Sequence, residues 1–227
     1  MILSVIIPAY NEIRTIKELL RRVASVDIPK EVIIVDDGST DGTREFLRSI
    51  ENKADFKVIF HAKNRGKGAA IRTAIPHVSG DVVIIQDADL EYDPRDYPRV
   101  IGSIVAGRAS VVYGSRYPKL KNYLPFTPNR MGVLVLTALA NLLFGARITD
   151  EATCYKAFRA DLLKSLPLKC ERFEFCPEVT AKVRKRGHRI HEVPISFRGR
   201  NVKEGKKIRW RDGLEAISAL IKYRFTD

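Results

Sequence analysis

The chain has 227 residues, of which 45% are hydrophobic and 30% are charged, and this balance supports a buried core and excludes a disordered chain. Its three cysteines, Cys154, Cys170 and Cys176, include no C-x-x-C pair, which excludes a disulfide scaffold and a zinc ribbon and is typical of a reducing compartment. The formal net charge is +13, and the whole excess lies in residues 114–227, which hold 24 Lys and Arg against 11 Asp and Glu, whereas residues 1–113 hold 16 of each.

Short apolar runs alternate with helical patterns in the first half of the chain. Strands are predicted over residues 2–8, 31–35, 57–61, 81–86 and 110–114. Helices are predicted from an N-cap at Asn11 to the residues before Pro29, over roughly 42–52, from the turn at 64–68 to about Ile75, and over 94–106. The alternation predicts a parallel, doubly wound sheet whose strand-to-helix loops share one edge, where open α/β sheets bind ligands.

The second half has a different rhythm and is expected to complete the same domain. It carries an apolar helix at Met131–Phe144 ended by Gly145, a basic helix over 176–187, a strand over 190–197, a basic loop at Gly199–Lys207 and a final amphipathic helix at Asp212–Arg224. No apolar run reaches the ~18–20 residues of a membrane span. Met1 leads directly into an apolar strand, so we expect no secretory signal.

Acidic residues follow the predicted strand at 81–86. Asp87 and Asp89 lie two residues apart, and Glu91 repeats that spacing. Residues i and i+2 of extended backbone point the same way, so these side chains can converge on one target. Carboxylate oxygens suit Mg²⁺ or Mn²⁺, and a cation held by one or two of them commonly binds a substrate diphosphate. A D-x-D sequence alone is a weak signal, because acidic turns are common.

Carboxylates also follow two other predicted strands, in Pro8-Ala-Tyr-Asn-Glu12 and in Asp36-Asp37. Turns and helix N-caps explain several polar residues there, but they do not explain Glu12, Asp37 and Asp89 together. Because the carboxyl ends of parallel strands share one edge of the sheet, these three side chains are expected to line a common cleft around a ligand.

The chain resembles the family 2 glycosyltransferases with the GT-A fold in four ordered motifs, which are Pro8-Ala-Tyr-Asn-Glu12, Asp36-Asp-Gly-Ser39, Asn64-Arg-Gly-Lys-Gly68 and Asp87-Ala-Asp89. The resemblance continues through Gly114-Ser-Arg116, Asn129-Arg130, Asp150–Lys156 and Glu192–Arg198. Within the family the chain is most similar to dolichyl-phosphate mannose synthases and related polyprenyl-phosphate glycosyltransferases. The resemblance implies an α/β fold with a Rossmann-like, mostly parallel central sheet flanked by helices, and with C-terminal amphipathic helices at the membrane interface.

On the donor side, the resemblance implies that a nucleotide-diphosphate sugar binds residues 1–113 of this single domain. Asp89 is expected to hold Mg²⁺ or Mn²⁺ on the diphosphate, beside Asp87 and Glu91, although several synthases carry Gln at the position of Glu91. Gly66 and Gly68 are expected to allow close backbone approach. The remaining donor-binding residues implied by the motifs are Pro8, Tyr10, Glu12, Asp37, Lys67, Asp87, Arg198 and Lys207.

On the acceptor side, residues 114–227 are expected to face the acceptor and the membrane. Arg116 and Arg130 match family positions near the acceptor phosphate, where arginines would stabilise developing negative charge. The basic stretch from Arg198 to Arg209 matches the segment that orders over donor and acceptor in the family. Asp150 occupies the position of the base in relatives with hydroxyl acceptors, and the sequence leaves open whether it is a base or orients the sugar.

The basic second half also bears on the partner of the protein. It favours a phosphate, a nucleic acid or an anionic membrane, with a Lys- and Arg-rich surface of no specific role as the alternative. The helix at 131–144 could be core or membrane interface, whereas the final helix, with Trp210 and Phe225 among basic residues, fits an interfacial anchor. We expect a cytoplasmic protein held peripherally at the cytoplasmic face of the membrane.

The sequence therefore predicts a metal-dependent, inverting glycosyltransferase that moves a hexose to a polyprenyl (dolichyl-type) phosphate, with mannose from GDP-mannose favoured by resemblance. One alternative keeps the fold but changes the donor to a UDP-sugar or the acceptor to a sugar or protein hydroxyl. A nucleic-acid-binding domain is a distant alternative, because basic and aromatic residues are not interleaved on strands. A Rossmann oxidoreductase is disfavoured, since no G-x-G-x-x-G follows the first strand.

Overall fold

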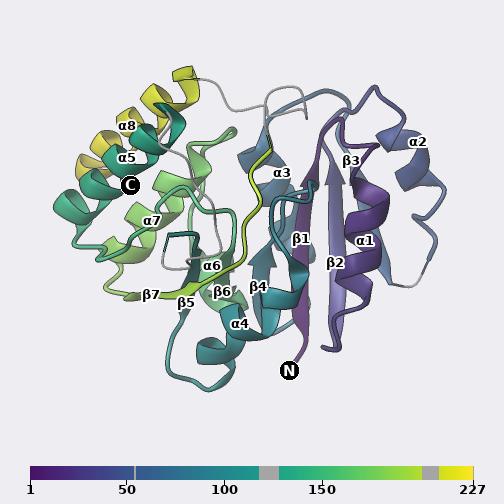
Figure 1. Ribbon diagram of the computed structural model, residues 1–227, viewed down its shortest axis with the longest axis horizontal. Helices are drawn as coiled ribbons and strands as arrows, with labels where there is room; N and C mark the ends of the chain where they lie inside the picture. Colours follow the sequence, from purple (N-terminus) through teal and green to yellow (C-terminus); the bar gives the residue numbers. More distant parts are fainter. Residues whose placement is uncertain (54, 118–127, 201–209, 227) are drawn as a thin grey trace.

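The structure is a computed structural model that describes residues 1–53, 55–117, 128–200 and 210–226. A seven-stranded sheet in the order β3-β2-β1-β4-β6-β5-β7 runs through the centre of the molecule (Figure 1). Its strands are β1 (Leu3–Ala9), β2 (Lys30–Asp36), β3 (Phe56–Phe60), β4 (Val82–Ile85), β5 (Val111–Ser115), β6 (Lys156–Arg159) and β7 (Ile190–Pro194). Only β6 runs antiparallel to its neighbours β4 and β5, so the predicted mostly parallel sheet is confirmed.

The central strands are apolar along most of their length because both faces of the sheet are covered. In the register of the sheet Ile6 lies opposite Ile33 of β2 and Ile85 of β4, and all three side chains are buried. Burial of each such side chain stabilises the fold by roughly 1.5–3 kcal/mol. The apolar character of these strands thus places them at the middle of the sheet, with their carboxyl ends at one edge.

The helices are α1 (Ile16–Ala24), α2 (Thr43–Arg48), α3 (Lys67–Ala74), α4 (Tyr97–Val105), α5 (Pro128–Phe144), α6 (Ala160–Ser165), α7 (Phe175–Lys185) and α8 (Trp210–Phe225), with short 3-10 turns η1 (Ile75–His77) and η2 (Pro94–Asp96). Helix α1 buries Ile16, Leu19, Leu20 and Val23, the apolar face that its sequence predicts. Helix α3 packs on β1 and β2, and α4 packs on β4, β5 and β6.

Two local predictions were wrong. Asn11 does not cap α1, because it has a positive φ of 50° and its side chain accepts a hydrogen bond from the backbone N–H of Thr40 at 2.8 Å. The helix begins only after Thr15. Strand β6 and helix α6 were missed, because four strand residues run directly into a six-residue helix and neither segment is long enough to show a period.

Helices α5, α7 and α8 pack against one another beyond the β7 end of the sheet (Figure 1). One face of α5 is core, with Leu136, Ala140 and Phe144 buried, whereas Leu142 on the opposite face is 79% exposed. The apolar run of α5 is therefore neither wholly core nor wholly surface. Within the described ranges, every helix is too short or too polar to cross a bilayer.

Candidate active site

Three carboxylates from two strand ends meet around one guanidinium group. Glu12 follows β1, and Asp89 and Glu91 follow β4, the strand next to β1 in the sheet. Arg200 donates to both carboxylate oxygens of Glu12 at 3.0 and 3.1 Å and to Asp89 Oδ2 at 2.7 Å, and its Nε lies 3.7 Å from Glu91 Oε1. Glu12 and Asp89, two of the three carboxylates expected to line one cleft, thus share a contact with Arg200.

This carboxylate cluster is defined as Glu12, Asp87, Asp89 and Glu91, and two basic side chains contact it. Lys67, at the start of α3, forms an ion pair with Asp87 at 2.5 Å, and Arg200 serves the other three carboxylates. Burial, with repulsion from Asp87 and Glu91, raises the pKa of Asp89 to about 7, although Arg200 opposes the shift.

The cluster offers oxygen ligands of the kind that a divalent cation binds. In the described part of the chain, no three His, Cys, Asp or Glu side chains are gathered closely enough to hold a metal ion by themselves. A Mg²⁺ site that also uses diphosphate oxygens needs only one or two protein carboxylates, so Asp89 with Asp87 or Glu91 fits such a site. The donor set is all oxygen, which suits Mg²⁺ or Mn²⁺ rather than a softer metal.

Asp37 lies at the same sheet edge, but its carboxylate is used within the protein. It accepts hydrogen bonds from the backbone N–H groups of Arg65 at 2.9 Å and Gly66 at 2.7 Å, and it contacts Nδ1 of the buried His61 at 2.7 Å. Asp37 therefore holds the loop before α3 against the end of β2. Within the described residues, the Asp37 carboxylate makes no hydrogen bond or ion pair with Glu12 or Asp89.

The glycines before α3 also have a structural use that the sequence did not predict. Gly66 has a φ of 99°, and a Cβ on Gly68 would lie 2.6 Å from the carbonyl oxygen of Cys170. The backbone N–H of Ala69 donates to the carbonyl of Glu171 at 2.8 Å. The close approach at these glycines is thus made by the chain's own segment 170–172.

A second cluster lies after β5, where Arg116 and Asp150 form a buried ion pair. Arg116 donates through Nε and Nη2 to the two oxygens of Asp150 at 2.7 and 2.6 Å, and its backbone N–H donates to Oδ2 at 3.0 Å. Asp150 is fully buried, and its own backbone N–H donates to Glu192 at 3.1 Å. Both oxygens of Asp150 are therefore occupied by Arg116, which favours orientation of that arginine over a role as base.

An aromatic pair joins the two clusters. Tyr92 and Phe197 stack edge to face with ring centroids 5.3 Å apart, and their backbones form a β-bridge. The Arg116 guanidinium lies 5.0 Å from the Phe197 ring centroid, while the backbone N–H of Arg200 donates to Glu91 at 2.9 Å. The segment from Phe197 to Arg200 thus contacts the carboxylate cluster at one end and Arg116 at the other.

The remaining predicted residues occupy varied positions. Pro8 and Tyr10 lie half-buried at and just after the end of β1, and Arg130 lies 5.7 Å from the ring centroid of Tyr117. The Arg198 side chain is exposed, and Lys207 lies outside the described residues. Cys154 is buried, as expected of a packed residue, and burial raises the pKa of its thiol far above the usual value.

The sequence analysis assigned no individual role to four residues of the site, which are Tyr92, Glu192, Phe197 and Arg200. Glu192 and Phe197 lie within a motif that suggested the resemblance, and Arg200 lies in the basic stretch. Their roles depend on contacts between residues about 40 to 190 positions apart. Tyr92 carries no sequence signal, since a tyrosine in a loop is common.

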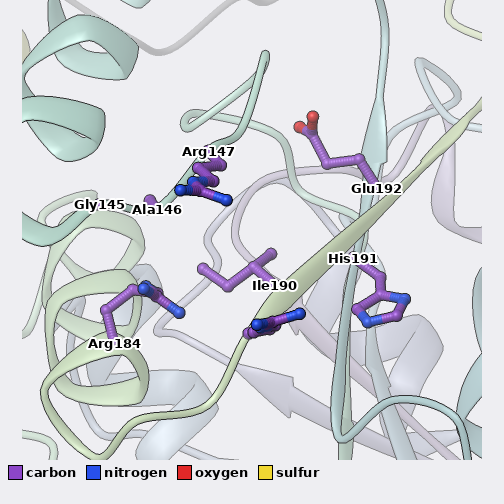
Figure 2. A pocket seen from close by; sticks show the side chains of 8 residues that line it. Gly145, Ala146, Arg147, Arg184, Ile190, His191 and Glu192 are labelled. Carbon is purple, nitrogen blue, oxygen red and sulfur yellow. The ribbon is translucent and has the colours of Figure 1, made fainter.

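A separate cavity of about 540 Å³ lies where the end of α5 and the end of α7 meet β7 (Figure 2). It is lined by Gly145, Ala146, Arg147, Arg184, Arg189, Ile190, His191 and Glu192. Arg184 donates to the carbonyls of Phe144 and His188, so part of this basic lining serves as a helix cap. The members of the carboxylate cluster do not line this cavity, whereas Glu192, which accepts a hydrogen bond from the backbone N–H of Asp150, does.

Solved structures share this arrangement of strands and helices. Glucosyl-3-phosphoglycerate synthase from Mycobacterium tuberculosis, in complex with Mn²⁺, UDP and phosphoglyceric acid, superimposes with a TM-score of 0.76 over 99% of this chain and 79% of that chain, at 21% identity. A structure of the same enzyme with Mg²⁺ and UDP has a TM-score of 0.70 at 22% identity. The fold of this chain is the GT-A fold of nucleotide-sugar glycosyltransferases, as the resemblance implied.

The sequence profile of "Glycosyl transferase family 2" matches residues 4–166, a range that begins in β1 and includes the carboxylate cluster apart from its partner Arg200. The chain belongs to this family.

Among curated relatives, UDP-N-acetylglucosamine–dolichyl-phosphate N-acetylglucosaminyltransferase of Methanococcus voltae is 32% identical over 92% of this chain and 94% of its own length. Dolichol-phosphate mannosyltransferase of Pyrococcus furiosus is 32% identical over 92% of this chain, and undecaprenyl-phosphate 4-deoxy-4-formamido-L-arabinose transferase of Edwardsiella ictaluri is 30% identical over 89%. The chain spans 61% and 62% of the length of these last two relatives. The relatives share a polyprenyl-phosphate acceptor by name and differ in the sugar.

Proposed function

We propose that this glycosyltransferase moves a hexose from a nucleotide-diphosphate donor to a polyprenyl phosphate with inversion at the anomeric carbon. The observation that carries the proposal is the pair of clusters joined by Tyr92 and Phe197, one rich in carboxylates and one presenting arginines. Carboxylates with a cation suit a donor diphosphate, and arginines suit an acceptor phosphate. The names of the relatives support the same acceptor class.

On the donor side, the carboxylate cluster would take Mg²⁺ or Mn²⁺ through Asp89 with Asp87 or Glu91. A cation bound there would neutralise charge on the departing nucleoside diphosphate. Lys67 fixes Asp87 in place, and Asp37 holds the loop before α3. GDP-mannose is the donor favoured by the resemblance, and the relative of matching length supports UDP-N-acetylglucosamine as the second candidate.

On the acceptor side, the chemistry requires alignment more than proton removal. A phosphomonoester has a second pKa of about 6, so its oxygen is already charged at neutral pH. That oxygen attacks the anomeric carbon, the bond from that carbon to the diphosphate oxygen breaks, and the nucleoside diphosphate leaves without a proton transfer. Arg116, oriented by Asp150, and Arg130 would hold the acceptor phosphate in line for this attack.

The acceptor is a lipid, so the proposal includes peripheral binding to a membrane surface. Helices α5 and α8 pack together and expose the apolar side chains of Met131, Leu134, Val135, Leu142, Leu214, Ile221 and Phe225. Basic residues Arg211, Lys222 and Arg224 lie on the same helix α8. An apolar stripe flanked by basic residues suits the interface of an anionic bilayer, and the cytoplasmic face is the expected location.

The deciding experiment measures transfer from radiolabelled GDP-mannose, UDP-N-acetylglucosamine and UDP-glucose to a chloroform-soluble product. Each donor is tested with and without a polyprenyl phosphate, and with Mg²⁺, Mn²⁺ or EDTA. We expect product with one donor only when both lipid phosphate and cation are present. Full activity in EDTA would contradict the cation site, and transfer to a sugar or peptide hydroxyl in place of the lipid would establish the alternative acceptor.

A further inference from the structure

Arg200 stands out because one side chain contacts every carboxylate of the cluster except Asp87. Its Nη2 bridges Glu12 and Asp89 at 3.0 and 2.7 Å. Only 16% of its side chain is exposed, and the Glu12 and Asp89 side chains are each 8% exposed. A guanidinium with this burial and this many charged contacts is held far more firmly than a surface ion pair.

The backbone of Arg200 is anchored independently of its guanidinium. Its N–H donates to Glu91 Oε1 at 2.9 Å, and the N–H of Arg198 donates to the carbonyl of Glu91, also at 2.9 Å. The bridge between Tyr92 and Phe197 adds a third attachment to the same loop. The side chain of Arg200 can therefore leave Glu12 and Asp89 by rotation about its own bonds while the backbone stays in place.

The contacts of Arg200 coincide with the groups assigned to the donor. Glu12 is the carboxylate expected at the nucleoside, and Asp89 is the one expected at the cation, so a single guanidinium covers both. Asp89 Oδ1 already accepts the N–H of Glu91 at 3.0 Å, and Oδ2 is the oxygen that Arg200 takes. A cation that binds Asp89 through Oδ2 has to replace the guanidinium there.

We propose that Arg200 is an internal cation that competes with the divalent metal ion for Asp89 and thereby makes metal binding depend on the nucleotide. A metal ion alone must displace the guanidinium from Asp89, which leaves Arg200 with Glu12 and Glu91 but without its shortest ionic contact. A nucleotide diphosphate that binds together with the metal ion supplies its phosphate oxygens as a new anionic partner for the guanidinium. Its nucleoside also replaces the guanidinium at Glu12. The proposal rests on the proposed donor site, and it adds the cause of cooperative binding of metal and nucleotide.

The test measures Mn²⁺ affinity by electron paramagnetic resonance of free Mn²⁺, with protein alone and with saturating GDP or UDP. It compares the wild-type protein with Arg200→Met, and it uses Arg198→Met as the matched control. Arg198→Met removes the same charge from an exposed side chain two residues away, so it reports the long-range electrostatic effect. Activity is not needed for any of these readouts.

In the wild type we expect weak binding of Mn²⁺ alone and at least about tenfold tighter binding with nucleotide. Arg198→Met is the control for the measurement without nucleotide only, and there it should match the wild type. In Arg200→Met, Mn²⁺ alone should bind at least about tenfold more tightly than in the wild type, because the charge that competes for Asp89 is gone. The ratio of the Mn²⁺ affinity with nucleotide to the Mn²⁺ affinity without nucleotide should therefore be smaller in Arg200→Met than in the wild type, since coupling between ligands is reciprocal. An Arg200→Met protein that matches Arg198→Met in Mn²⁺ affinity without nucleotide would overturn the role of Arg200.

Two further measurements separate the possible failures. If the wild type binds no Mn²⁺ even with GDP and with UDP, the proposed cation site fails rather than the role of Arg200. If Arg200→Met does not fold, as judged by circular dichroism, the arginine Nε–H resonances of the wild type are followed by NMR on addition of Mg²⁺ with nucleotide. A resonance that is absent in Arg200→Lys should shift, and its failure to shift would refute displacement of the guanidinium.

Discussion

Asp89 carries a carboxyl group whose surroundings disfavour its charged form. Burial, with repulsion from Asp87 and Glu91, raises its pKa to about 7, far above the value of about 3.9 for an unfolded aspartate. A raised folded-state pKa stabilises the protein at low pH, and this stability is lost as pH rises through the folded-state pKa. The ionised form of Asp89 therefore lowers the stability of the fold, and it suits a positively charged partner.

The first prediction follows from this linkage. Asp89→Asn should raise the melting temperature in EDTA at pH 8, where wild-type Asp89 is ionised, and the gain should shrink toward pH 5. The same substitution should lower kcat/KM by at least about 100-fold, because the leaving diphosphate would lose the cation proposed to bind Asp89. Scanning calorimetry at the two pH values tests the first part. A variant less stable than the wild type at pH 8 would contradict the raised pKa.

The second prediction concerns the buried pair of Arg116 and Asp150. Arg116→Met leaves a fully buried carboxylate without its partner, which should cost about 3–5 kcal/mol of the free energy of unfolding. Adding Asp150→Asn should recover much of this loss, so a double-mutant cycle in urea should show strong coupling. Additive effects of the two substitutions would show that the pair contributes little.

A related contrast separates orientation from proton transfer. Asp150→Asn keeps the shape of the side chain but removes its charge. We expect it to weaken acceptor binding and to lower kcat without shifting the pH profile of the reaction, because Asp150 holds Arg116 and takes no proton. Loss of an acidic limb in the pH profile would instead identify Asp150 as a base.

At the scale of elements, the buried carboxylate of Glu178 fixes α7 to the preceding loop. Glu178 of α7 accepts Nζ of Lys182 at 2.7 Å and the backbone N–H groups of Lys169 and Cys170 at 2.7 and 2.8 Å. Burial alone would raise the pKa of Glu178, but these hydrogen bonds outweigh it and hold the pKa below its usual value. The residues that follow Cys170 contact the first turn of α3, so this anchor also supports the donor side.

The third prediction is that Glu178→Gln destabilises the protein by about 3 kcal/mol at pH 7, because Lys182 stays buried without its carboxylate. A lowered folded-state pKa gives stability that is present above the unfolded value and is lost as pH falls through the folded one. The difference in the free energy of unfolding between the variant and the wild type should therefore become smaller below about pH 4. Urea unfolding at pH 7 and below pH 4 measures the difference in the free energy of unfolding between the variant and the wild type. Equal differences at the two pH values would exclude a contribution from the lowered pKa of Glu178.

At the scale of the whole molecule, exposed apolar side chains and positive charge gather on the same half of the chain. Of the ten large hydrophobic side chains found exposed in the described residues, seven lie on α5 and α8. These helices pack together beyond β7, away from the β3 end of the sheet (Figure 1). A surface of this kind suits an anionic membrane, since apolar burial and electrostatic attraction then act together.

The fourth prediction tests this surface directly. Leu142→Lys with Phe225→Lys, which are 79% and 83% exposed, should reduce sedimentation with phosphatidylglycerol vesicles at least tenfold. Each buried apolar side chain contributes roughly 1.5–3 kcal/mol, which outweighs the attraction of an added lysine. Val105→Lys, at 50% exposure on α4, is the matched control and should bind as the wild type does. Equal loss in the control would place the membrane contact elsewhere.

Much of the fold could be predicted from the sequence because its signals are local. Apolar strands of four to seven residues and the amphipathic face of α1 follow from period and burial alone. The strand-end carboxylates were also found, since the position of a residue after a parallel strand determines its edge of the sheet. The short β6 was missed, and the N-cap at Asn11 was wrong, because tertiary hydrogen bonds decided both segments.

By itself the sequence determined that Glu12 and Asp89 would lie at one edge of a parallel sheet and that the positive charge would lie in the second half. Only the tertiary structure decided what each carboxylate contacts. Asp37 binds a loop, Asp150 binds Arg116, and Glu12 with Asp89 binds Arg200, which lies more than 100 residues away from both. The positions of the apolar strands follow from local pattern, whereas the pairing of charges depends on distances in space that no spacing along the chain reveals.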